Sequence, residues 1–286
     1  MTDRQQPLEG MSAVITAGGG AIGSATARVL VRDGAHVLIS GRTAEKLQGV
    51  VASLEQEAEE AGGSISWSTA DGLDEAQIAA LVERAGQRTG RVDMAVNVVG
   101  GGGGGSAPIL RYKVEDLEAV LRQNIVSAYL LLKHAGGAMV RQGGGSFVAV
   151  SSMQATEPAP FLGAYCASKA GLEMLCKVAA DELGEHNVRI NMVRPGLTRT
   201  GAPGHPSGSP EAMEAYFEQQ PLKRGGEPRN IAAAIRYFLG PESDWTTGTT
   251  LTVDGGNSLR RFPDLTFYWQ DRMGEEMDKA TRGDVS

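Results

Sequence analysis

Three side chains that could move a proton lie in one short stretch of the sequence. Tyr165 and Lys169 are four residues apart in a helical pattern, and Ser152 ends an apolar run thirteen residues before the tyrosine. Side chains four apart project from one helical face, so the phenol and the ammonium can share a site. A nearby ammonium favours phenolate and lowers the pKa of a tyrosine, which is about 10 when free. We therefore expect Tyr165 to transfer protons while Ser152 holds a substrate oxygen.

A Tyr-x-x-x-Lys pattern alone is weak evidence, because it also occurs in helices whose tyrosine is half-exposed and whose lysine is solvated. A glycine-rich turn supplies a second signal. Thr16 to Gly23 reads TAGGGAIG and lies between a short apolar run and a helical pattern. Backbone N–H groups of such a turn, at the positive end of a helix, can receive a pyrophosphate. Glycine-rich turns are common in α/β proteins, but one placed directly after the first strand favours a dinucleotide site.

The second expected strand ends in Ser40-Gly41-Arg42, a position that faces the adenosine ribose in a dinucleotide fold. An acidic residue there would accept the two ribose hydroxyls, whereas an arginine pairs with a 2′-phosphate. Arg42 therefore favours NADP(H) over NAD(H). The alternative interpretation is a solvated surface arginine.

The elements that must position these residues alternate along the chain. Short apolar runs predict strands over residues 12–16, 36–40, 64–68, 94–98, 146–150, 189–193 and 250–253. Apolar residues at helical spacing predict a helix after the glycine turn and further helices over residues 44–61, 75–89, 114–142, 165–185 and 228–239. This alternation predicts an α/β fold: a Rossmann-like doubly wound parallel sheet in a single domain of three αβα layers. Ligands of such sheets bind beyond the carboxyl ends of the strands.

Composition argues against several classes of partner. The chain of 286 residues has a net charge of −7, whereas nucleic-acid binders concentrate Lys and Arg on one face. The polar N-terminus and the shortness of the longest apolar stretch, residues 128–132, predict a cytoplasmic protein that does not enter a membrane. Cys166 and Cys176 are about three helical turns apart and are expected to be reduced thiols. The four histidines are scattered without ligand spacing, so no metal site is expected.

Taken in order, these motifs resemble those of the short-chain dehydrogenase/reductase family over nearly the whole chain. TAGGGAIG is similar to the family's glycine turn, and Asp71 to its aspartate near the adenine. The strand end from Asp93 to Gly100 resembles its Asn-Asn-Ala-Gly motif. RPGLTRT, from Arg194 to Thr200, resembles the segment that holds the nicotinamide carboxamide, and PLKRGGEP followed by LTVDGG is similar to the family's ending.

The resemblance implies an NADP(H)- or NAD(H)-dependent oxidoreductase that interconverts a ketone and a secondary alcohol. Tyr165 would be the general acid/base, Lys169 would lower its pKa and hold the nicotinamide ribose, and Ser152 would bind the carbonyl or alcohol oxygen. Asn124 would complete the catalytic tetrad by keeping a helix irregularity and a proton-relaying water. The implied cofactor-binding residues are Thr16, Gly18, Gly19, Gly20, Ile22, Arg42, Asp71, Gly72, Asn97, Val98, Gly100, Tyr165, Lys169, Pro195, Gly196, Thr198 and Thr200.

Two departures from the family pattern bear on the cofactor site. Ala17 and Ala21 stand where the family usually has glycine, and a Cβ at a position with positive φ would cost on the order of 1 kcal/mol. NVVG, from Asn97 to Gly100, replaces the Asn-Asn-Ala-Gly motif, so any contact of the second Asn side chain is lost.

Two other functions are considered beside carbonyl chemistry. One is a non-catalytic dinucleotide sensor, which the altered glycine turn would suit. The other is a reductase of the C=C bond of an enoyl or dienoyl thioester. Sensors of this fold often lose the tyrosine or the lysine, which this chain keeps. The family's enoyl reductases usually widen the Tyr-to-Lys spacing, and its dienoyl reductases lack this tyrosine. By this resemblance, the four-residue step between Tyr165 and Lys169 favours C=O over C=C.

Residues 1–258 are expected to form the catalytic domain, with 259–286 as an appended tail. Segments 100–106, 153–162 and 197–217 should border the substrate pocket, with residues 100–106 and 200–210 as loops, and their apolar content suggests a hydrophobic substrate. The tail gathers aromatic residues between Phe262 and Trp269, so we expect it to pack on its own subunit or a neighbour and to fray after Trp269. The resemblance implies a homodimer or homotetramer formed through helices 114–142 and 165–185.

Overall fold

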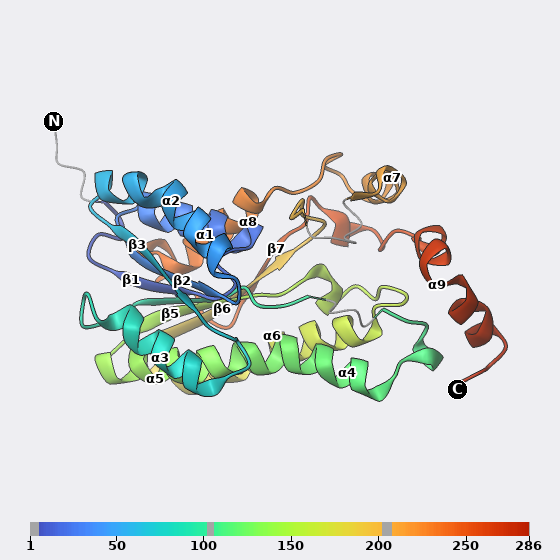
Figure 1. Ribbon diagram of the computed structural model, residues 1–286, viewed down its shortest axis with the longest axis horizontal. Helices are drawn as coiled ribbons and strands as arrows, with labels where there is room; N and C mark the ends of the chain where they lie inside the picture. The colour runs from blue at the N-terminus through green and yellow to red at the C-terminus, as the bar shows by residue number, and fades with distance from the viewer. Residues whose placement is uncertain (1–5, 102–105, 202–207, 286) are drawn as a thin grey trace.

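The protein is built around a parallel sheet covered by helices on both faces (Figure 1). The computed structural model describes residues 6–101, 106–201 and 208–285. In this part of the chain the sheet has seven strands in the order β3-β2-β1-β4-β5-β6-β7, and all neighbours are parallel. The strands are β1 (Ser12–Ile15), β2 (His36–Gly41), β3 (Ser64–Thr69), β4 (Met94–Asn97), β5 (Gly145–Val150), β6 (Val188–Pro195) and β7 (Thr250–Val253). The predicted Rossmann-like, three-layer fold is confirmed.

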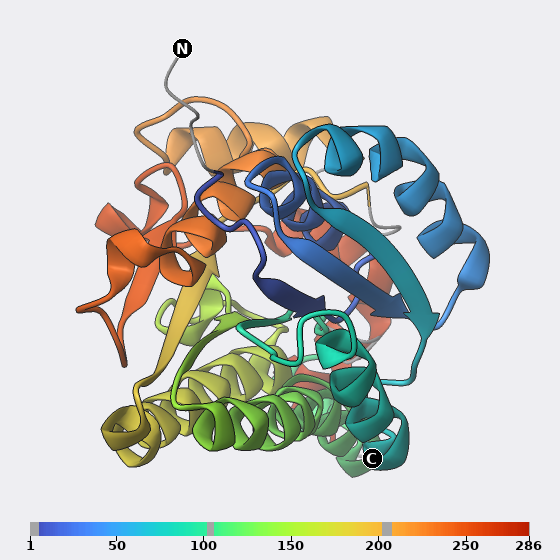
Figure 2. The same ribbon diagram turned by 90° about the vertical axis from the view of Figure 1, so that its left-hand side faces the viewer.

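Alternation along β1 shows why the sheet is buried on both faces. Ala13 and Ile15 pack into one core cluster, while Val14 between them packs into the other. Side chains of successive strand residues point to opposite faces, so a run of apolar residues needs apolar cover on both sides. Helices supply this cover above and below the sheet (Figure 2).

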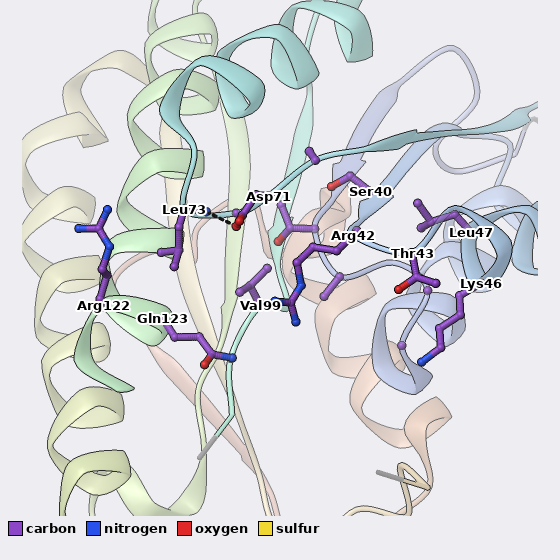
Figure 3. Close-up of a pocket in the computed structure, with 18 of the residues that line it drawn as sticks. Ser40, Arg42, Thr43, Lys46, Leu47, Asp71, Leu73, Val99, Arg122 and Gln123 are labelled. Carbon is purple, nitrogen blue, oxygen red and sulfur yellow. Dashed lines mark hydrogen bonds between the residues drawn. The ribbon is translucent and has the colours of Figure 1, made fainter. Parts of the chain in front are cut away.

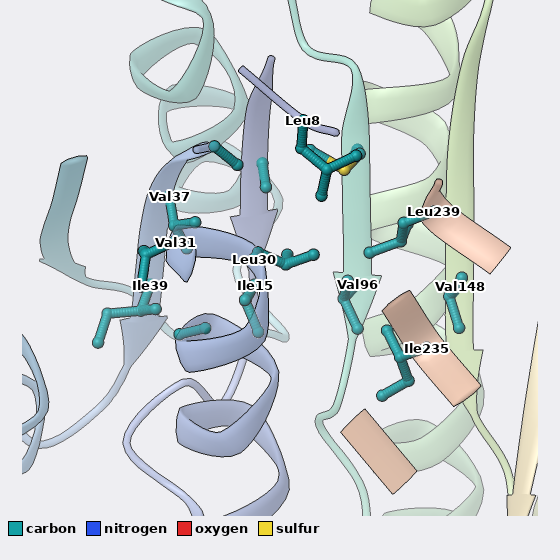
Figure 4. Packing of buried hydrophobic residues seen from close by; sticks show 14 of the residues in the cluster. Leu8, Ile15, Leu30, Val31, Val37, Ile39, Val96, Val148, Ile235 and Leu239 are labelled. Carbon is teal, nitrogen blue, oxygen red and sulfur yellow. The ribbon is translucent and has the colours of Figure 1, made fainter. Parts of the chain in front are cut away.

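The first core cluster lies beneath helices α1 (Ala21–Arg32), α2 (Ala44–Glu60) and α8 (Pro228–Leu239). Figure 4 shows Leu30 of α1 and Ile235 of α8 packing against the strand residues Ile15 and Val96. The second cluster lies beneath α3 (Glu75–Gly86), α5 (Ser127–Gln142) and α6 (Gly163–Leu183). These two core clusters, one on each face of the sheet, fix the positions of the strands and of their carboxyl ends.

The long helix predicted over residues 114–142 is confirmed, and it contains a π-helical irregularity. The chain is continuously helical through α4 (Val114–Leu121), a π-helical segment η2 (Arg122–Val126) and α5. The π-helical segment contains Asn124, the residue to which the family resemblance assigns a helix irregularity. The other predicted elements are present with bounds shifted by up to three residues, because side-chain caps and tertiary contacts set the last turn.

Shorter elements surround the carboxyl end of the sheet. They are η1 (Ile109–Arg111), η3 (Met153–Ala155), η4 (Gly184–His186), α7 (Pro210–Glu218), η6 (Pro241–Ser243) and η7 (Asn257–Leu259). Residues 102–105 and 202–207, which belong to the two predicted loops, lie outside the described residues. Within the described ranges, none of the helices combines the length and apolarity needed to cross a bilayer.

The C-terminal tail continues as helix α9 (Thr266–Thr281), so the prediction that it frays after Trp269 is wrong. Leu265 and Tyr268 are buried against α7, as expected for the aromatic cluster. Beyond a kink at Met273, Arg111 of η1 forms an ion pair with Glu276. This polar anchor extends the ordered tail past its aromatic part, and the apolar pattern alone could not reveal it.

Candidate active site

The predicted proton-transfer residues lie together at the carboxyl end of β5. Ser152 lies two residues after the end of β5 and is buried, and Tyr165 lies in the first turn of α6. Lys169, one turn later, is buried with its Nζ 5.8 Å from the centre of the Tyr165 ring. Lys169 Nζ donates a hydrogen bond to the carbonyl oxygen of Val150 at 3.0 Å. The spacing inferred from the sequence therefore places hydroxyl, phenol and ammonium in one site.

Burial dominates the electrostatics of this site. It raises the pKa of Tyr165, and a hydrogen bond with Ser152 lowers that pKa only in part. Burial also lowers the pKa of Lys169 to about 8, opposed by the charges of Cys176 and Glu173. The effect of the Lys169 charge on the pKa of the phenol stays a prediction of the family resemblance. A phenol whose pKa is raised by burial holds its proton at neutral pH and can act as an acid.

Asn124 explains the π-helical break. Its side chain is fully buried, and Nδ2 donates at 3.0 Å both to Val120, four residues earlier in the helix, and to Gly101. Its Oδ1 accepts from the Gly101 backbone N–H at 3.1 Å. The side chain thus satisfies a carbonyl that the helix break leaves free and ties the helix to the chain after β4. A Cβ on Gly100 would lie 2.7 Å from both Asn124 Oδ1 and Lys169 Nζ, so a larger residue there would have to displace these two side-chain ends.

A large cavity opens along the carboxyl ends of β1, β2 and β4 (Figure 3). Its volume is about 700 Å³, within the range of cofactor sites. Seven of the predicted cofactor-binding residues line it: Thr16, Gly19, Gly20, Arg42, Asp71, Gly72 and Gly100. The cavity lies where the strand order reverses, and it is lined by the backbone of the glycine turn together with Asp71 and Arg42. Both features fit a dinucleotide.

Ala17 carries the backbone strain expected of the glycine turn. Its φ is +52°, whereas Ala21 opens α1 and has no positive φ. The neighbouring glycines are sterically required, since a Cβ on Gly18 would lie 2.5 Å from Ile39 Cβ and one on Gly23 would lie 2.5 Å from the Ala17 oxygen. The expected cost of replacing glycine therefore falls on Ala17 alone.

Known proteins resemble this chain in both sequence and structure. The family model described as enoyl-(acyl carrier protein) reductase matches residues 17–258. A 3-oxoacyl-(acyl-carrier-protein) reductase FabG of Thermotoga maritima is 33% identical over 249 residues, which cover 87% of this chain and 98% of that protein. The 7alpha-hydroxysteroid dehydrogenase of Escherichia coli is 31% identical over 87% of this chain and 94% of its own length. A short-chain type dehydrogenase/reductase from Mycobacterium ulcerans superposes with a TM-score of 0.87 at 35% identity, covering 92% of this chain and 95% of that one.

The chain belongs to the short-chain dehydrogenase/reductase family. It is an NAD(P)-dependent oxidoreductase of that family.

In this short-chain dehydrogenase/reductase, several predicted cofactor contacts lie beneath the cavity surface. Asn97 is fully buried, accepts from Thr16 Oγ1 at 3.2 Å and donates to the Val99 oxygen at 3.3 Å. Val98 and Ile22 pack against the first core cluster, and Gly18 lies against β2. These residues shape the turn and the strand ends from below.

The segment after β6 lies apart from the cavity lining. Pro195 ends β6, and a Cβ on Gly196 would lie 2.6 Å from the Cα of Asp254. Thr198 is buried and donates to the Gly196 oxygen at 3.0 Å, while its backbone pairs with Gly226. Thr200 ends the described part of this loop. The segment is thus firmly fixed up to Thr198.

Two residues of the site, Lys46 and Glu173, were not predicted, although their positions in the sequence could have indicated them. Lys46 lines the cavity from the first turn of α2, four residues after Arg42 along the chain. Glu173 follows Lys169 by the same step and is buried. Glu173 receives hydrogen bonds from Ser151 at 2.7 Å and from Arg194 at 3.0 and 2.6 Å. It therefore joins the ends of β5 and β6 directly behind Lys169.

Gln154 is a third residue that the sequence analysis missed, and nothing in the pattern marks it. Its Oε1 accepts a hydrogen bond from the Ser152 hydroxyl, and its backbone N–H donates to Ser152 Oγ at 3.4 Å. This contact depends on the 3₁₀ turn of η3, which brings residues two apart together.

Among the described residues, no group of three or more His, Cys, Asp and Glu side chains could hold a metal ion.

Proposed function

We propose that this protein interconverts a ketone and a secondary alcohol on an apolar substrate, using NADP(H). The observation that carries the proposal is the joining of Ser152, Tyr165 and Lys169 at one end of the sheet, beside a dinucleotide-sized cavity. When bound, the nicotinamide supplies or accepts the hydride. All proton handling then belongs to side chains of this chain.

In the direction of reduction, Ser152 Oγ and Tyr165 Oη would hold the carbonyl oxygen, and Tyr165 would donate its proton as charge develops there. The raised pKa of Tyr165 keeps that proton in place at neutral pH. Lys169, anchored on the Val150 carbonyl, places a positive charge beneath the phenol ring. In the direction of oxidation the phenol must first lose its proton, so higher pH favours alcohol oxidation.

Two exposed cations support NADP(H) as the cofactor. Arg42 and Lys46 both line the cavity, and within the described residues neither forms an ion pair or side-chain hydrogen bond. Figure 3 shows the two side chains extending to the same side of the cavity. The 2′-phosphate of NADP(H) is the group that would form ion pairs with these two cations. The solved 7α-hydroxysteroid dehydrogenase complex contains NADH, so NAD(H) is the alternative cofactor.

The cofactor proposal predicts a change of preference on charge reversal at Arg42. In Arg42→Asp, the kcat/KM for NADPH should fall by about tenfold to a hundredfold, because hydrogen bonds to charged groups contribute about 1.5 to 3 kcal/mol. The value for NADH should stay the same or rise, since a carboxylate can accept the ribose hydroxyls. Steady-state kinetics with each cofactor give the ratio. An unchanged NADPH/NADH ratio would remove the argument from Arg42.

Two relatives support carbonyl chemistry through what their names say they act on. One is named a 3-oxoacyl-(acyl-carrier-protein) reductase, and the 7α-hydroxysteroid dehydrogenase was solved with a 7-oxo bile acid conjugate. The predicted pocket walls around Met153, Leu197 and Met213 are apolar and buried. A hydrophobic ketone or alcohol fits both observations.

Reduction of a C=C bond is the second candidate, since the matching family model is described as an enoyl reductase. One panel separates the candidates: NADPH consumption with apolar ketones and with a 2-enoyl thioester. Carbonyl chemistry predicts turnover of ketones only. Turnover of the enoyl thioester alone would overturn it, and cofactor binding with no turnover of either would favour the non-catalytic sensor.

We also propose that the protein forms a homo-oligomer through α5 and α6. Tyr129 on α5 and Met174 and Val178 on α6 are large apolar side chains exposed on these helices. Residues of this kind are enriched where subunits meet, because association removes them from water.

A further inference from the structure

Glu173 is a buried carboxylate that the proposed proton transfer does not use. It lies in the middle of α6 and is 4% exposed. Its Oε1 accepts hydrogen bonds from Ser151 Oγ at 2.7 Å and from Arg194 Nε at 3.0 Å. Its Oε2 accepts from Arg194 Nη2 at 2.6 Å and from Thr250 Oγ1 at 3.5 Å. Both oxygens are therefore held by donors from the ends of β5, β6 and β7.

The partners of this carboxylate adjoin the residues of the active site. Ser151 directly precedes the serine of the site, and Arg194 directly precedes the Pro-Gly turn that the family resemblance assigns to the nicotinamide. Glu173 itself follows Lys169 by one turn of α6. One carboxylate thus ties the helix that carries the phenol and the ammonium to the two strand ends that border them.

Glu173 is also the charge that acts on Lys169. Burial lowers the pKa of Lys169 to about 8, opposed by Cys176 and Glu173. Burial raises the pKa of Cys176 to about 12, so that thiol is neutral near pH 8. Other groups that the described residues place around Lys169 are uncharged at this pH: the Val150 carbonyl, the Tyr165 phenol and the Asn124 amide. The carboxylate of Glu173 therefore opposes the loss of solvation.

We propose that Glu173 is a positioning residue of this reaction: it holds Ser152, Lys169 and the Pro-Gly turn in place relative to one another and supplies the negative charge that balances the Lys169 ammonium. Arg194 modulates that charge, because it shares the same carboxylate through two hydrogen bonds. The inference rests on the proposed carbonyl chemistry, in which the ammonium lies beneath the phenol ring.

The two members of the ion pair give opposite electrostatic predictions. Glu173→Gln removes a negative charge near Lys169, so the lysine should lose its proton at a lower pH than in the unmodified protein. Arg194→Gln removes a positive charge and leaves the carboxylate less neutralised, so the lysine should keep its proton to a higher pH. Both variants break the same ion pair, so a role in folding alone predicts the same change in both.

NMR of the full-length protein labelled with ¹³C-lysine measures this titration directly. The Cε resonance of Lys169 is identified by its loss in Lys169→Met. Glu182→Gln is the matched control, because it removes an exposed carboxylate from the same helix, and it should leave the Lys169 titration unchanged. Shifts in the same direction in Glu173→Gln and Arg194→Gln, or no shift in Glu173→Gln, would overturn the proposal.

The double variant Glu173→Gln/Arg194→Gln guards against misfolding of the single variants, since a buried charge without its partner is strongly destabilising. Removal of both charges leaves none of them unpaired, so this variant should melt close to the unmodified protein. Lys169 should still titrate at a lower pH, because Glu173 acts on it directly and Arg194 acts through the carboxylate. An unchanged Lys169 titration in this folded variant would overturn the proposal.

Kinetics test the effect on the reaction, with the apolar ketone that the unmodified protein reduces fastest. Glu173→Gln should lower kcat at pH 7 about tenfold to a hundredfold, because small displacements around a reacting centre cost this much. The KM for the ketone should stay nearly the same, since Glu173 lies behind Lys169. Glu173→Asp keeps the charge and should recover part of kcat. A loss in Glu173→Asp as large as that in Glu173→Gln would contradict the proposal.

The NMR titration separates this inference from the proposed function. If the unmodified protein reduces no ketone, the carbonyl proposal fails. Opposite shifts of the Lys169 resonance in Glu173→Gln and Arg194→Gln would then still support the role of Glu173, and their absence would overturn it.

Discussion

Lys169 carries its charge where solvent hardly reaches it. Its side chain is buried, with a hydrogen bond to the Val150 carbonyl and with Glu173 one turn away. Loss of solvation lowers its pKa to about 8. The unfolded chain binds this proton up to about pH 10.4, so the unfolded state holds more protons between the two values. The buried charge therefore destabilises the fold below pH 8, and this cost disappears as the pH rises toward 10.4.

Lys169→Met should consequently raise the free energy of unfolding at pH 7 by up to about 3 kcal/mol, which is the pKa difference at 1.36 kcal/mol per unit. The gain should be lost near pH 10.4. Urea denaturation at both pH values measures it. Lys177→Met, an exposed lysine on the same helix, should change stability by less than about 0.5 kcal/mol at either pH. A gain for Lys169→Met that is the same at both pH values would contradict the account.

The identity of the reactive residues could be inferred from spacing, but their charge states could not. Four-residue spacing fixes that Tyr165 and Lys169 share a face, since helix geometry is the same everywhere. The direction of the Tyr165 pKa shift depends on how much solvent the whole fold removes, which no local pattern contains. Contacts such as Gln154 with Ser152 likewise depend on a turn that forms only in the folded chain.

The glycine turn between β1 and α1 shows what an element requires of its residues. Ala17 has φ of +52°, where glycine is less strained, while Ala21 lies in the first turn of α1. Ala17→Gly should therefore stabilise the protein by up to about 1 kcal/mol, and Ala21→Gly should destabilise it by about 0.5 to 1 kcal/mol. Thermal denaturation of the two variants compares them directly. Shifts of the same sign in both would show that the turn is not strained at Ala17.

At this scale the sequence predicted the order of strands and helices because their apolar periods differ. Periodicity alone did not predict the π-helical segment η2, since the chain around Asn124 has helical periodicity on both sides, and only the family resemblance implied an irregularity there. The break is stabilised by bonds from Asn124 to Gly101, which is distant along the chain. Long-range partners of this kind also explain the buried Glu173–Arg194 pair, whose members come from α6 and β6.

Across the whole molecule, the exposed apolar residues of α5 and α6 predict association. Light scattering should give a mass two or four times that of the 30.0 kDa chain. Met174→Glu places a charge on a side chain that is 60% exposed on α6, and it should shift the mass toward a single chain. A single-chain mass for the unmodified protein at micromolar concentration would exclude the proposed interface.

The structure of the C-terminal tail could be predicted from the sequence only in part. The aromatic cluster from Phe262 to Trp269 indicated that the segment packs on protein, and Tyr268 is indeed buried. The rest of α9 is charged and looked unstructured, yet Arg111 pairs with Glu276 and Asp284. Ion pairs between distant segments leave no periodic signal in the sequence. Only the folded structure therefore shows that the end of the tail is helical and packed.

The central claim is that the Tyr165 phenol protonates the carbonyl oxygen beside a bound nicotinamide. Tyr165→Phe removes only that hydroxyl and should lower kcat for ketone reduction by about 10²- to 10⁴-fold, the usual contribution of a positioned general acid. The dissociation constant for NADPH, measured by fluorescence titration, should change little. Tyr237→Phe, which removes a hydroxyl from the exposed face of α8, should leave both quantities unchanged. Ketone turnover in Tyr165→Phe equal to that of the unmodified protein would contradict the account.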